Sequence, residues 1–227
     1  MKVALLLITD GRDNYLTDTL TSIGRFCGDM DWAQKIMVDD SGRDTPPPVD
    51  LDGWTLVQNR PRQGLGPAVR AGWAALDDDI DYVWHHEDDF LLVDTPPIAE
   101  MVEALETHSV NPRLAQVALL RQPWSDLEKL NGSIYACRPG EYRPFHNLVI
   151  QRHLFTFNPS IYPRWVTEQV GVGVGLEQDV TDQLTQDGAT FFAYWGGLDD
   201  APRCWHIGVS RSDGYRWGID DEMERSR

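Results

Sequence analysis

Residues 82–94, YVWHHEDDFLLVD, give the strongest indication of the fold. An apolar run from Tyr82 to His85, typical of a buried strand, leads into the consecutive carboxylates Glu87, Asp88 and Asp89, after which apolar residues resume. Open α/β sheets bind ligands at the carboxyl ends of their strands, and hard cations prefer oxygen ligands. The stretch therefore predicts a site for a metal and a diphosphate. A solvated acidic turn between a strand and a helix is the alternative.

The residues before this stretch alternate between strand and helix patterns. Strands are expected at Val3 to Ile8, Lys35 to Val38 and Trp54 to Gln58, and a helix is expected at Asp13 to Phe26. The segment RQGLGPAVRAGWAAL, residues 62–76, predicts a further helix with a proline in its first turn. Such alternation indicates a parallel sheet with right-handed crossovers, whose ligand site lies at the strand ends.

The second half of the chain is less regular. Prolines 96 and 97 predict the start of a helix that continues to about His108, and residues 147–163 read as irregular strands stopped by a proline. The remaining predicted elements are a strand at Leu114 to Leu120, a short helix at Tyr162 to Val170, a helix at Gly175 to Gln186 and a strand at Thr190 to Trp195.

Composition restricts the classes of partner. The formal net charge is −16, and no long cluster of Lys and Arg occurs, which disfavours tight nonspecific binding to nucleic acid. An anionic ligand would then need a cation. Three widely spaced cysteines show no zinc pattern and are expected to be reduced and buried. The apolar run near the N-terminus is too short for a signal peptide or transmembrane segment, so we expect a cytoplasmic protein.

Several motifs, taken in order, resemble the GT-A-fold glycosyltransferases of the family-2 type. They are ITDGR, VDDSG, GLGPAVRAGW, HHEDDF, LEQDVTDQL and WHIG. GLGPAVRAGW is similar to a segment of polyprenol-phosphate mannose synthases, and EDDF stands where the fold keeps its DxD motif. The likeness covers residues 3–95 clearly and residues 175–210 more loosely.

The resemblance implies an α/β fold of the GT-A (nucleotide-diphospho-sugar transferase) type, with a Rossmann-like, mostly parallel central sheet flanked by helices. It also implies a single domain over residues 1–227. Residues 1–95 would bind the nucleotide sugar and the metal. Residues 96–227 would bind the acceptor and supply the catalytic base.

In enzymes of this type the ends of the first two strands hold the nucleotide. Thr9, Asp10, Arg12 and either Asp39 or Asp40 would accordingly surround the base and ribose, where a carboxylate can accept a hydrogen bond from a ring N–H. The alternative for Asp39 and Asp40 is that they only close a turn through backbone hydrogen bonds.

The diphosphate is expected near the GLGP segment. Arg70 would pair with its oxygens, assisted by N–H groups of the loop that contains Gly64. A surface salt bridge is the alternative for Arg70. Glu87 and Asp89 are expected to approach one cation and its ribose, and Asp88 is counted with Glu87 among the residues that bind the nucleotide sugar.

The predicted metal ligands are Asp89, Glu87 and His206. Glu87 and Asp89 would project to the same side of an extended strand, and Asp89 corresponds to the last acid of the DxD motif. A late histidine returns to the metal in many GT-A enzymes, although a structural role for His206 is the alternative. The expected cofactor is Mn²⁺ or Mg²⁺, which would neutralise charge on the departing nucleoside diphosphate.

Transfer with inversion needs a general base for the acceptor hydroxyl. If a helix has begun by residue 177, Glu177 shares a face with Val180 and Leu184 and points to the cleft, whereas Asp179 lies nearly opposite. A later helix start would favour Asp179. A plain acid at a helix N-terminus is the third possibility.

The expected function is metal-dependent glycosyl transfer, with inversion, from a UDP- or GDP-sugar to a hydroxyl acceptor. The acceptor could be a glycan, a lipid carrier, a protein or a modified DNA base. The candidates for binding it are aromatic residues of the second half, namely Trp124, Tyr135, Tyr142, Phe145, Tyr162 and Trp165. Two alternatives remain. A sugar-1-phosphate nucleotidyltransferase would need a loop rich in glycine, arginine and lysine after the first strand, and ITDGRDNYL lacks the glycines and the lysine. A non-catalytic nucleotide- or glycan-binding module would bind without turnover.

Overall fold

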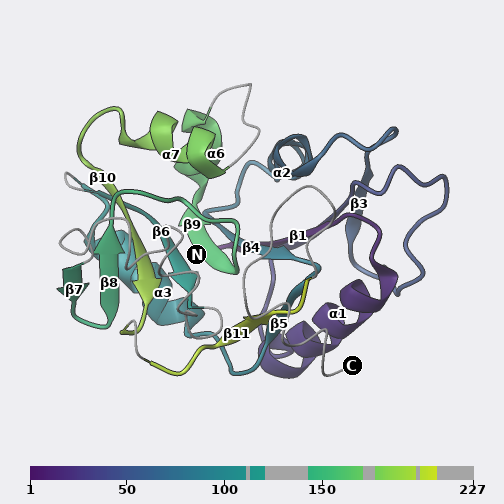
Figure 1. The fold of residues 1–227 in the computed structure, drawn as a ribbon, viewed down its shortest axis with the longest axis horizontal. Helices are drawn as coiled ribbons and strands as arrows, with labels where there is room; N and C mark the ends of the chain where they lie inside the picture. The colour runs from purple at the N-terminus through teal and green to yellow at the C-terminus, as the bar shows by residue number, and fades with distance from the viewer. Residues whose placement is uncertain (111–112, 121–142, 171–176, 198–199, 209–227) are drawn as a thin grey trace.

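The computed structural model describes residues 1–110, 113–120, 143–170, 177–197 and 200–208. A central sheet crosses the molecule, with helices on both of its faces (Figure 1). In the first half the elements are β1 (Val3–Thr9), α1 (Asp13–Cys27), β2 (Gln34–Asp39), β3 (Thr55–Gln58), α2 (Leu65–Ala74), β4 (Tyr82–Glu87), β5 (Phe90–Leu92) and α3 (Ile98–Thr107). The second half contains β6 (Arg113–Leu119), β7 (Arg143–Phe145), β8 (Leu148–Gln151), β9 (Ser160–Pro163), α6 (Arg164–Gln169), α7 (Glu177–Thr185), β10 (Thr190–Trp195) and β11 (Cys204–His206).

The central sheet is mixed and has nine strands in the order β3-β2-β1-β4-β9-β6-β10-β8-β7. The first four strands are mutually parallel, as the sequence predicted, and β10 is parallel to β6. In contrast, β9 is antiparallel to both neighbours, and β8 is antiparallel to β10 and β7. The α/β fold class is confirmed, but the parallel arrangement is a property of the first half. Parallel neighbours need long crossovers, which the closely spaced strands of residues 143–163 do not provide.

Most predicted elements are present with small shifts of their ends. The strand at Thr190–Trp195 is confirmed, and β4 continues to Glu87. The short helix begins at Arg164 because Tyr162 and Pro163 belong to β9. The sequence did not predict β5 and β11, which form a separate antiparallel pair beside the central sheet (Figure 1).

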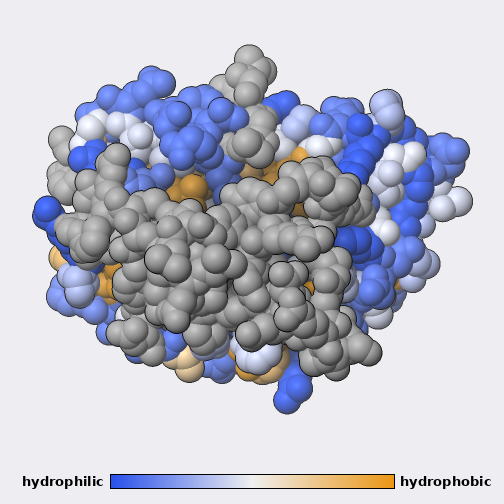
Figure 2. Space-filling model, viewed as in Figure 1, coloured by the Kyte–Doolittle hydropathy of each residue, from blue (hydrophilic) through white to orange (hydrophobic). Residues whose placement is uncertain are grey.

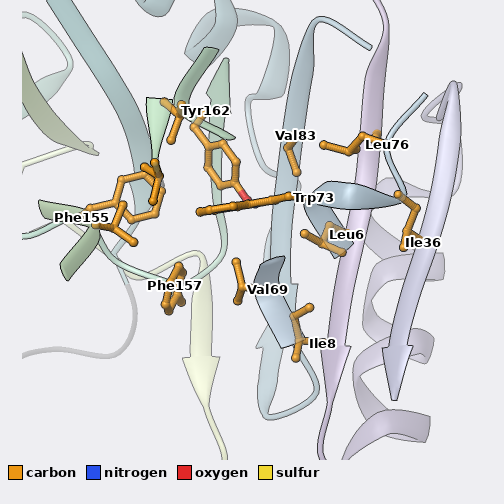
Figure 3. Packing of buried hydrophobic residues seen from close by; sticks show 14 of the residues in the cluster. Leu6, Ile8, Ile36, Val69, Trp73, Leu76, Val83, Phe155, Phe157 and Tyr162 are labelled. Carbon is orange, nitrogen blue, oxygen red and sulfur yellow. The ribbon is translucent and has the colours of Figure 1, made fainter. Parts of the chain in front are cut away.

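One face of the sheet packs against α2, α6 and α7. Leu6 from β1 contacts α2 so closely that a Cβ on Gly72 would lie 2.4 Å from its side chain, which explains the glycine in this helix. Trp73 from the same helix donates a hydrogen bond to the hydroxyl of Tyr162 on β9, at 2.9 Å (Figure 3). Tyr162, one of the aromatic residues considered for acceptor binding, is therefore part of the core.

The opposite face packs against α1, α3 and β5. Its buried members include Leu5, Trp84 and Met101, together with the free cysteines Cys27 and Cys204. Cys137 lies outside the described residues. The surface over α6, α7 and the β3 edge is largely hydrophilic (Figure 2). Within the described part of the chain, no helix has the length and apolar character to cross a membrane.

Candidate functional site

The acidic turn lies between β4 and β5 and is held by backbone contacts. Strand β4 ends at Glu87, and the carbonyl of Ile8 on β1 accepts a hydrogen bond from the amide of Asp88 at 2.9 Å. The hydroxyl of Thr19 on α1 donates to the carbonyls of Asp88 and Phe90, at 2.7 and 3.0 Å. Asp88 and Asp89 are only 1% and 7% exposed, so this turn is not a solvated surface feature.

Arg12, at the end of the loop after β1, lies among three aspartates. Its Nη1 is 2.7 Å from Oδ2 of Asp89, its Nε is 2.9 Å from Oδ1 of Asp10, and its Nη2 contacts Oδ1 of Asp88. Although burial opposes its charge, Asp89, Asp88 and Asp10 raise the pKa of Arg12. The guanidinium is therefore an internal cation that offsets the clustered negative charge.

Asp88 turns toward β1. Its Oδ2 accepts a hydrogen bond from the hydroxyl of Thr9 at 2.6 Å, and the amide of Asp10 lies 3.3 Å from the same oxygen. Burial raises the pKa of Asp88 to about 6, against the lowering influence of Arg12. Through these contacts, Asp88 and Thr9 fix the position of the end of β1 relative to β4.

Asp89 meets the C-terminal strand β11. Because β11 pairs with β5, Nε2 of His206 lies 3.3 Å from Oδ2 of Asp89. Burial raises the pKa of Asp89, but the hydrogen bond with His206 and the charges of His206 and Arg12 together hold it below its ordinary value. A Cβ on Gly208 would lie 2.2 Å from Oδ2 of Asp89 and 2.9 Å from Nε2 of His206. Glycine at 208 thus keeps space beside the predicted ligands.

Glu87 completes the acidic group. Burial raises its pKa well above the ordinary value, and the charges of Asp89 and Glu177 raise it further while His206 lowers it. Oε1 of Glu87 and Oδ1 of Asp89 are buried without a hydrogen-bond partner among the described residues. Unpartnered carboxylate oxygens beside an imidazole and a second carboxylate are a donor set that fits Mn²⁺ or Mg²⁺.

As they stand, however, no three His, Cys, Asp or Glu side chains of the described residues converge into a metal site. Arg12 accounts for this arrangement, because it holds Asp88 and Asp89 in the place where a cation would draw the ligands together. The donor chemistry fits a divalent cation, and rearrangement of Arg12 would accompany its binding.

Glu177 is the first residue of α7. The helix has therefore begun by residue 177, which was the condition for choosing Glu177 over Asp179 as the base. Val180 and Leu184 are buried on that helix, and Glu177 affects the pKa of Glu87. Its Oε1 accepts hydrogen bonds from the hydroxyl of Thr156 at 2.9 Å and from the amide of Phe157 at 2.5 Å. The carboxylate is therefore held in a fixed position facing the acidic turn. Asp179 is half-buried on α7.

Asp39 and Asp40 at the end of β2 organise neighbouring loops. Asp39 accepts hydrogen bonds from the amide of Ser41 at 3.1 Å and from Nε of Arg43 at 2.9 Å. Asp40 accepts from Nδ2 of Asn59 at 2.8 Å.

The loop before α2 depends on the same acid. The amides of Gln63 and Gly64 donate to Asp40 at 2.9 and 2.7 Å, so these N–H groups, which were expected to assist the diphosphate, already have a carboxylate partner. Gly64 has a φ of +93° and is the N-cap of α2. Arg70 is half-buried within that helix.

The two histidines of β4 point to opposite faces. The ring of His85 stacks on Phe157 with centroids 5.2 Å apart, and Nε2 of His86 lies 2.9 Å from the carbonyl oxygen of Phe90. Burial lowers the pKa of His85 to about 3 and that of His86 to about 4. Both rings are parts of the support beneath the acidic turn.

Sequence reasoning missed several residues that shape this site. Thr19, Thr156 and Gly208 act through contacts between segments distant in the chain, and only the HIG sequence around Gly208 gave a local signal. Arg12 was expected beside the nucleotide, and its contact with the acidic turn was not anticipated. Of the aromatic candidates for acceptor binding, Trp124, Tyr135 and Tyr142 lie outside the described residues.

Comparison with known proteins gives a fold likeness. No protein-family model matches the chain, and no curated protein sequence matches it. Structures of S. aureus TarS are similar. TarS 1-349 has a TM-score of 0.56 at 11% identity over 91% of this chain and 60% of that chain. TarS 1-349 in complex with UDP-GlcNAc has a TM-score of 0.57 at 14% identity over 95% of this chain and 62% of that chain.

The chain thus spans about three-fifths of the length of these TarS structures. Likeness at such low identity bears on the fold alone. The parallel first four strands and the helices on both faces of the sheet agree with the expectation from the sequence motifs, whereas the second half of the sheet is mixed. The chain accordingly has the α/β fold of the GT-A type, with a mixed central sheet flanked by helices, that TarS also has.

Proposed function

We propose that this protein is a metal-dependent, inverting glycosyltransferase that moves a sugar from a nucleotide-diphosphate sugar to a hydroxyl acceptor. The observation that carries the proposal is the pair of buried carboxylate oxygens without a hydrogen-bond partner among the described residues, Oε1 of Glu87 and Oδ1 of Asp89, at the carboxyl end of β4. His206 lies beside them, with its Nε2 3.3 Å from Oδ2 of Asp89. In an open α/β sheet, ligands bind next to the carboxyl ends of the parallel strands. A group of buried, incompletely partnered carboxylates in that position is better suited to binding than to stability.

The donor is a UDP- or GDP-sugar, and a UDP-sugar is the first to test, because a TarS structure of the same fold contains UDP-GlcNAc. Asp10, Arg12 and Asp39 would lie nearest to the nucleotide, from the ends of β1 and β2. Asp40 would act through the loop that contains Gly64. Arg70 is proposed as a contact of the diphosphate.

Asp89, Glu87 and His206 would hold Mn²⁺ or Mg²⁺. Such an ion supplies Lewis-acid stabilisation of the charge that develops on the leaving diphosphate. Arg12 would release Asp89 when the donor binds and then pair with the anionic diphosphate, for which its planar N–H fork is suited.

Glu177 is proposed as the general base, with Asp179 as the alternative. The hydrogen bonds from Thr156 and Phe157 orient its carboxylate, and a base must be held within reach of the acceptor hydroxyl to remove its proton. The carboxylate would accept that proton as the hydroxyl oxygen attacks the anomeric carbon from the side opposite the leaving group.

The first experiment is a thermal unfolding measurement with UDP-GlcNAc, other UDP-sugars and GDP-sugars, each with and without Mn²⁺. A ligand that binds only the native state raises the melting temperature, and the stabilisation grows with the logarithm of the ratio of ligand concentration to Kd once that ratio exceeds one. A shift that requires both nucleotide sugar and metal supports the proposal, and metal-dependent hydrolysis of the same donor supports catalysis. Binding without turnover under any acceptor condition would favour a non-catalytic module, and no shift with any donor would contradict the proposal.

A further inference from the structure

A cavity of about 520 Å³ lies far along the sheet from the acidic turn. Its lining comes from β7, from β8 and the two residues after it, from the start of β10 and from the residue after α3. The residues are His108, Arg143, Phe145, Ile150, Gln151, Arg152, His153, Ala189 and Phe191. We call this cavity the β8 pocket, because β8 lies at its centre. Its volume is in the range of small-molecule sites.

The fold itself creates the pocket. Helix α3 packs against β6 and β9 and ends at Thr107, so it does not extend over the neighbouring strands. Arg143 and Ile150 are register partners on β7 and β8, and Phe145 on β7 shares a face with Arg143 because strand side chains alternate. The ring of His108 stands edge-on to Phe145, with centroids 4.9 Å apart, and forms the wall at the end of α3.

The direction of the strands separates this pocket from the proposed donor site. Strands β4 and β6 run in the same direction, because each is antiparallel to β9, and β10 is parallel to β6. Glu87 lies at the carboxyl end of β4, whereas Ala189 precedes the first residue of β10. The β8 pocket therefore lies near the amino end of β10, whereas Glu87 lies at the carboxyl end of β4. No residue of the pocket takes part in the proposed reaction.

The charge of the pocket is opposite to that of the protein. The chain has 36 acidic and 20 basic residues, yet the described lining contains two arginines and no carboxylate. Many arginines of the described chain pair with acids, namely Arg12, Arg43, Arg60, Arg62, Arg113, Arg164 and Arg203. Neither Arg143 nor Arg152 forms an ion pair with a described residue.

The loop after β8 gives Arg152 a fixed position. The side chain of Gln151 is buried, and its Oε1 accepts hydrogen bonds from the amides of His153 and Leu154 at 2.6 and 2.9 Å. Nε of Arg152 donates to the carbonyl of Thr190 at 3.1 Å. The terminal N–H groups of its guanidinium are thus presented beside apolar walls formed by Phe145, Ile150 and Phe191.

We propose that the β8 pocket binds an organic anion with an apolar body. A phosphate or carboxylate group would pair with Arg143 and Arg152, and an aromatic or alkyl body would lie against Phe145, Ile150 and Phe191. Guanidinium groups bind such anions through charge-assisted hydrogen bonds, and burial of the apolar body supplies the second contribution to affinity.

The test is isothermal titration of the whole chain with 1-naphthyl phosphate, compared with neutral 1-naphthol and with inorganic phosphate. We expect 1-naphthyl phosphate to bind with a stoichiometry of one. Both 1-naphthol and inorganic phosphate should bind at least about tenfold more weakly, because 1-naphthol lacks the anionic group and inorganic phosphate lacks the apolar body. Equal binding of 1-naphthol would show that the pocket is only apolar, and absence of binding by the naphthyl phosphate would overturn the proposal.

Variants locate the binding. The double variant Arg143→Ala/Arg152→Ala should lower the affinity at least about tenfold, and Arg143→Lys should retain most of it. Both arginines are exposed, and neither forms an ion pair with a described residue, so the variants should leave the described fold intact. Arg60→Ala, at an exposed arginine paired with Asp44, is the matched control and should change nothing. Unchanged affinity in the double variant would refute the assignment. Displacement of the probe by UDP, or its loss in Asp89→Asn, would place it in the donor site instead.

Discussion

Arg12 and Asp89 form an ion pair of 2.7 Å between the loop after β1 and the acidic turn, and the same Asp89 oxygen lies 3.3 Å from His206. One carboxylate is thus shared by a guanidinium and an imidazole. Arg12 follows β1 and His206 belongs to β11, so their two contacts with Asp89 connect the first strand of the fold with the last described one.

The Arg12→Ala variant should be less stable without metal and should respond more strongly to it. Removing Arg12 leaves the buried Asp88 and Asp89 without their guanidinium partner, which we expect to cost about 3 kcal/mol. Thermal unfolding with and without Mn²⁺ measures both effects. Arg62→Ala is the control, because Arg62 pairs with Asp10 but has no contact with Asp89. If Mn²⁺ raised the melting temperature of the variant no more than that of the unaltered protein, the proposal that a metal ion replaces Arg12 beside Asp89 would be contradicted.

The Asp89→Asn variant should lose metal-dependent binding of the nucleotide sugar. The substitution preserves size but removes the charge that an oxygen ligand supplies to a hard cation. Titration of UDP-GlcNAc in the presence of Mn²⁺ measures the loss, with Asp44→Asn at an exposed position as the comparison. Retained metal-dependent binding would remove Asp89 from the ligand set.

The Gly208→Ala variant tests the close approach of β11 to the acidic turn. The new methyl group would lie 2.2 Å from Oδ2 of Asp89, so either the carboxylate or the strand end must shift. We expect weaker Mn²⁺ binding by about tenfold or more, and lower stability by about 1–3 kcal/mol as for other overpacked sites. Gly24→Ala on α1 meets no atom within 4 Å and should be neutral or slightly stabilising. Equal behaviour of the two variants would argue against the arrangement described for Gly208.

The Glu177→Gln variant should keep donor affinity while reducing turnover by about 10²-fold or more, as expected for loss of a general base. Glutamine can still accept the hydrogen bonds from Thr156 and Phe157, so the local structure should remain. Donor titration and initial rates separate the two effects. Asp182→Asn, on the same helix, is the control, and Asp179→Asn tests the alternative base. Full activity of Glu177→Gln would transfer the role elsewhere.

Acid pH should destabilise the fold partly through Asp39. Burial raises the pKa of this group, but hydrogen bonds from Ser41 and Arg43 hold it below its ordinary value overall. The unfolded state then binds more protons than the folded state near pH 4, so the free energy of unfolding falls as the pH drops below about 5. Urea unfolding between pH 7 and pH 3 should show a shallower pH dependence in Asp39→Asn than in the unaltered protein. An identical slope would show that Asp39 makes no contribution.

The sequence predicted the elements that bury continuous apolar runs. Val3 to Ile8 and Thr190 to Trp195 are clear because both faces of these strands are covered, and the acids after Trp84 mark a strand end. The antiparallel β9 was not anticipated as such. Its direction depends on which strands flank it, and local composition does not record that.

The sequence placed several candidate residues at strand ends, but it did not predict their contacts. The motif order indicated Asp89, His206 and Glu177 as candidates, and the structure brings Asp89 and His206 together through β5 and β11. Strands of only three residues carry no periodic signal, so this pairing had no local indication. The contact between Arg12 and Asp89 likewise depends on the turn at Gly11, whose φ of +95° redirects the chain after β1.

The β5–β11 pair also has a consequence for biosynthesis. His206 and Asp89 are 117 positions apart, and the pairing of their strands is what brings them together. While a polypeptide is still emerging from the ribosome, the aspartate is therefore exposed long before its imidazole partner has been translated. Under the proposed function, tight capture of a cation by the nascent protein would wait until that later segment has been made.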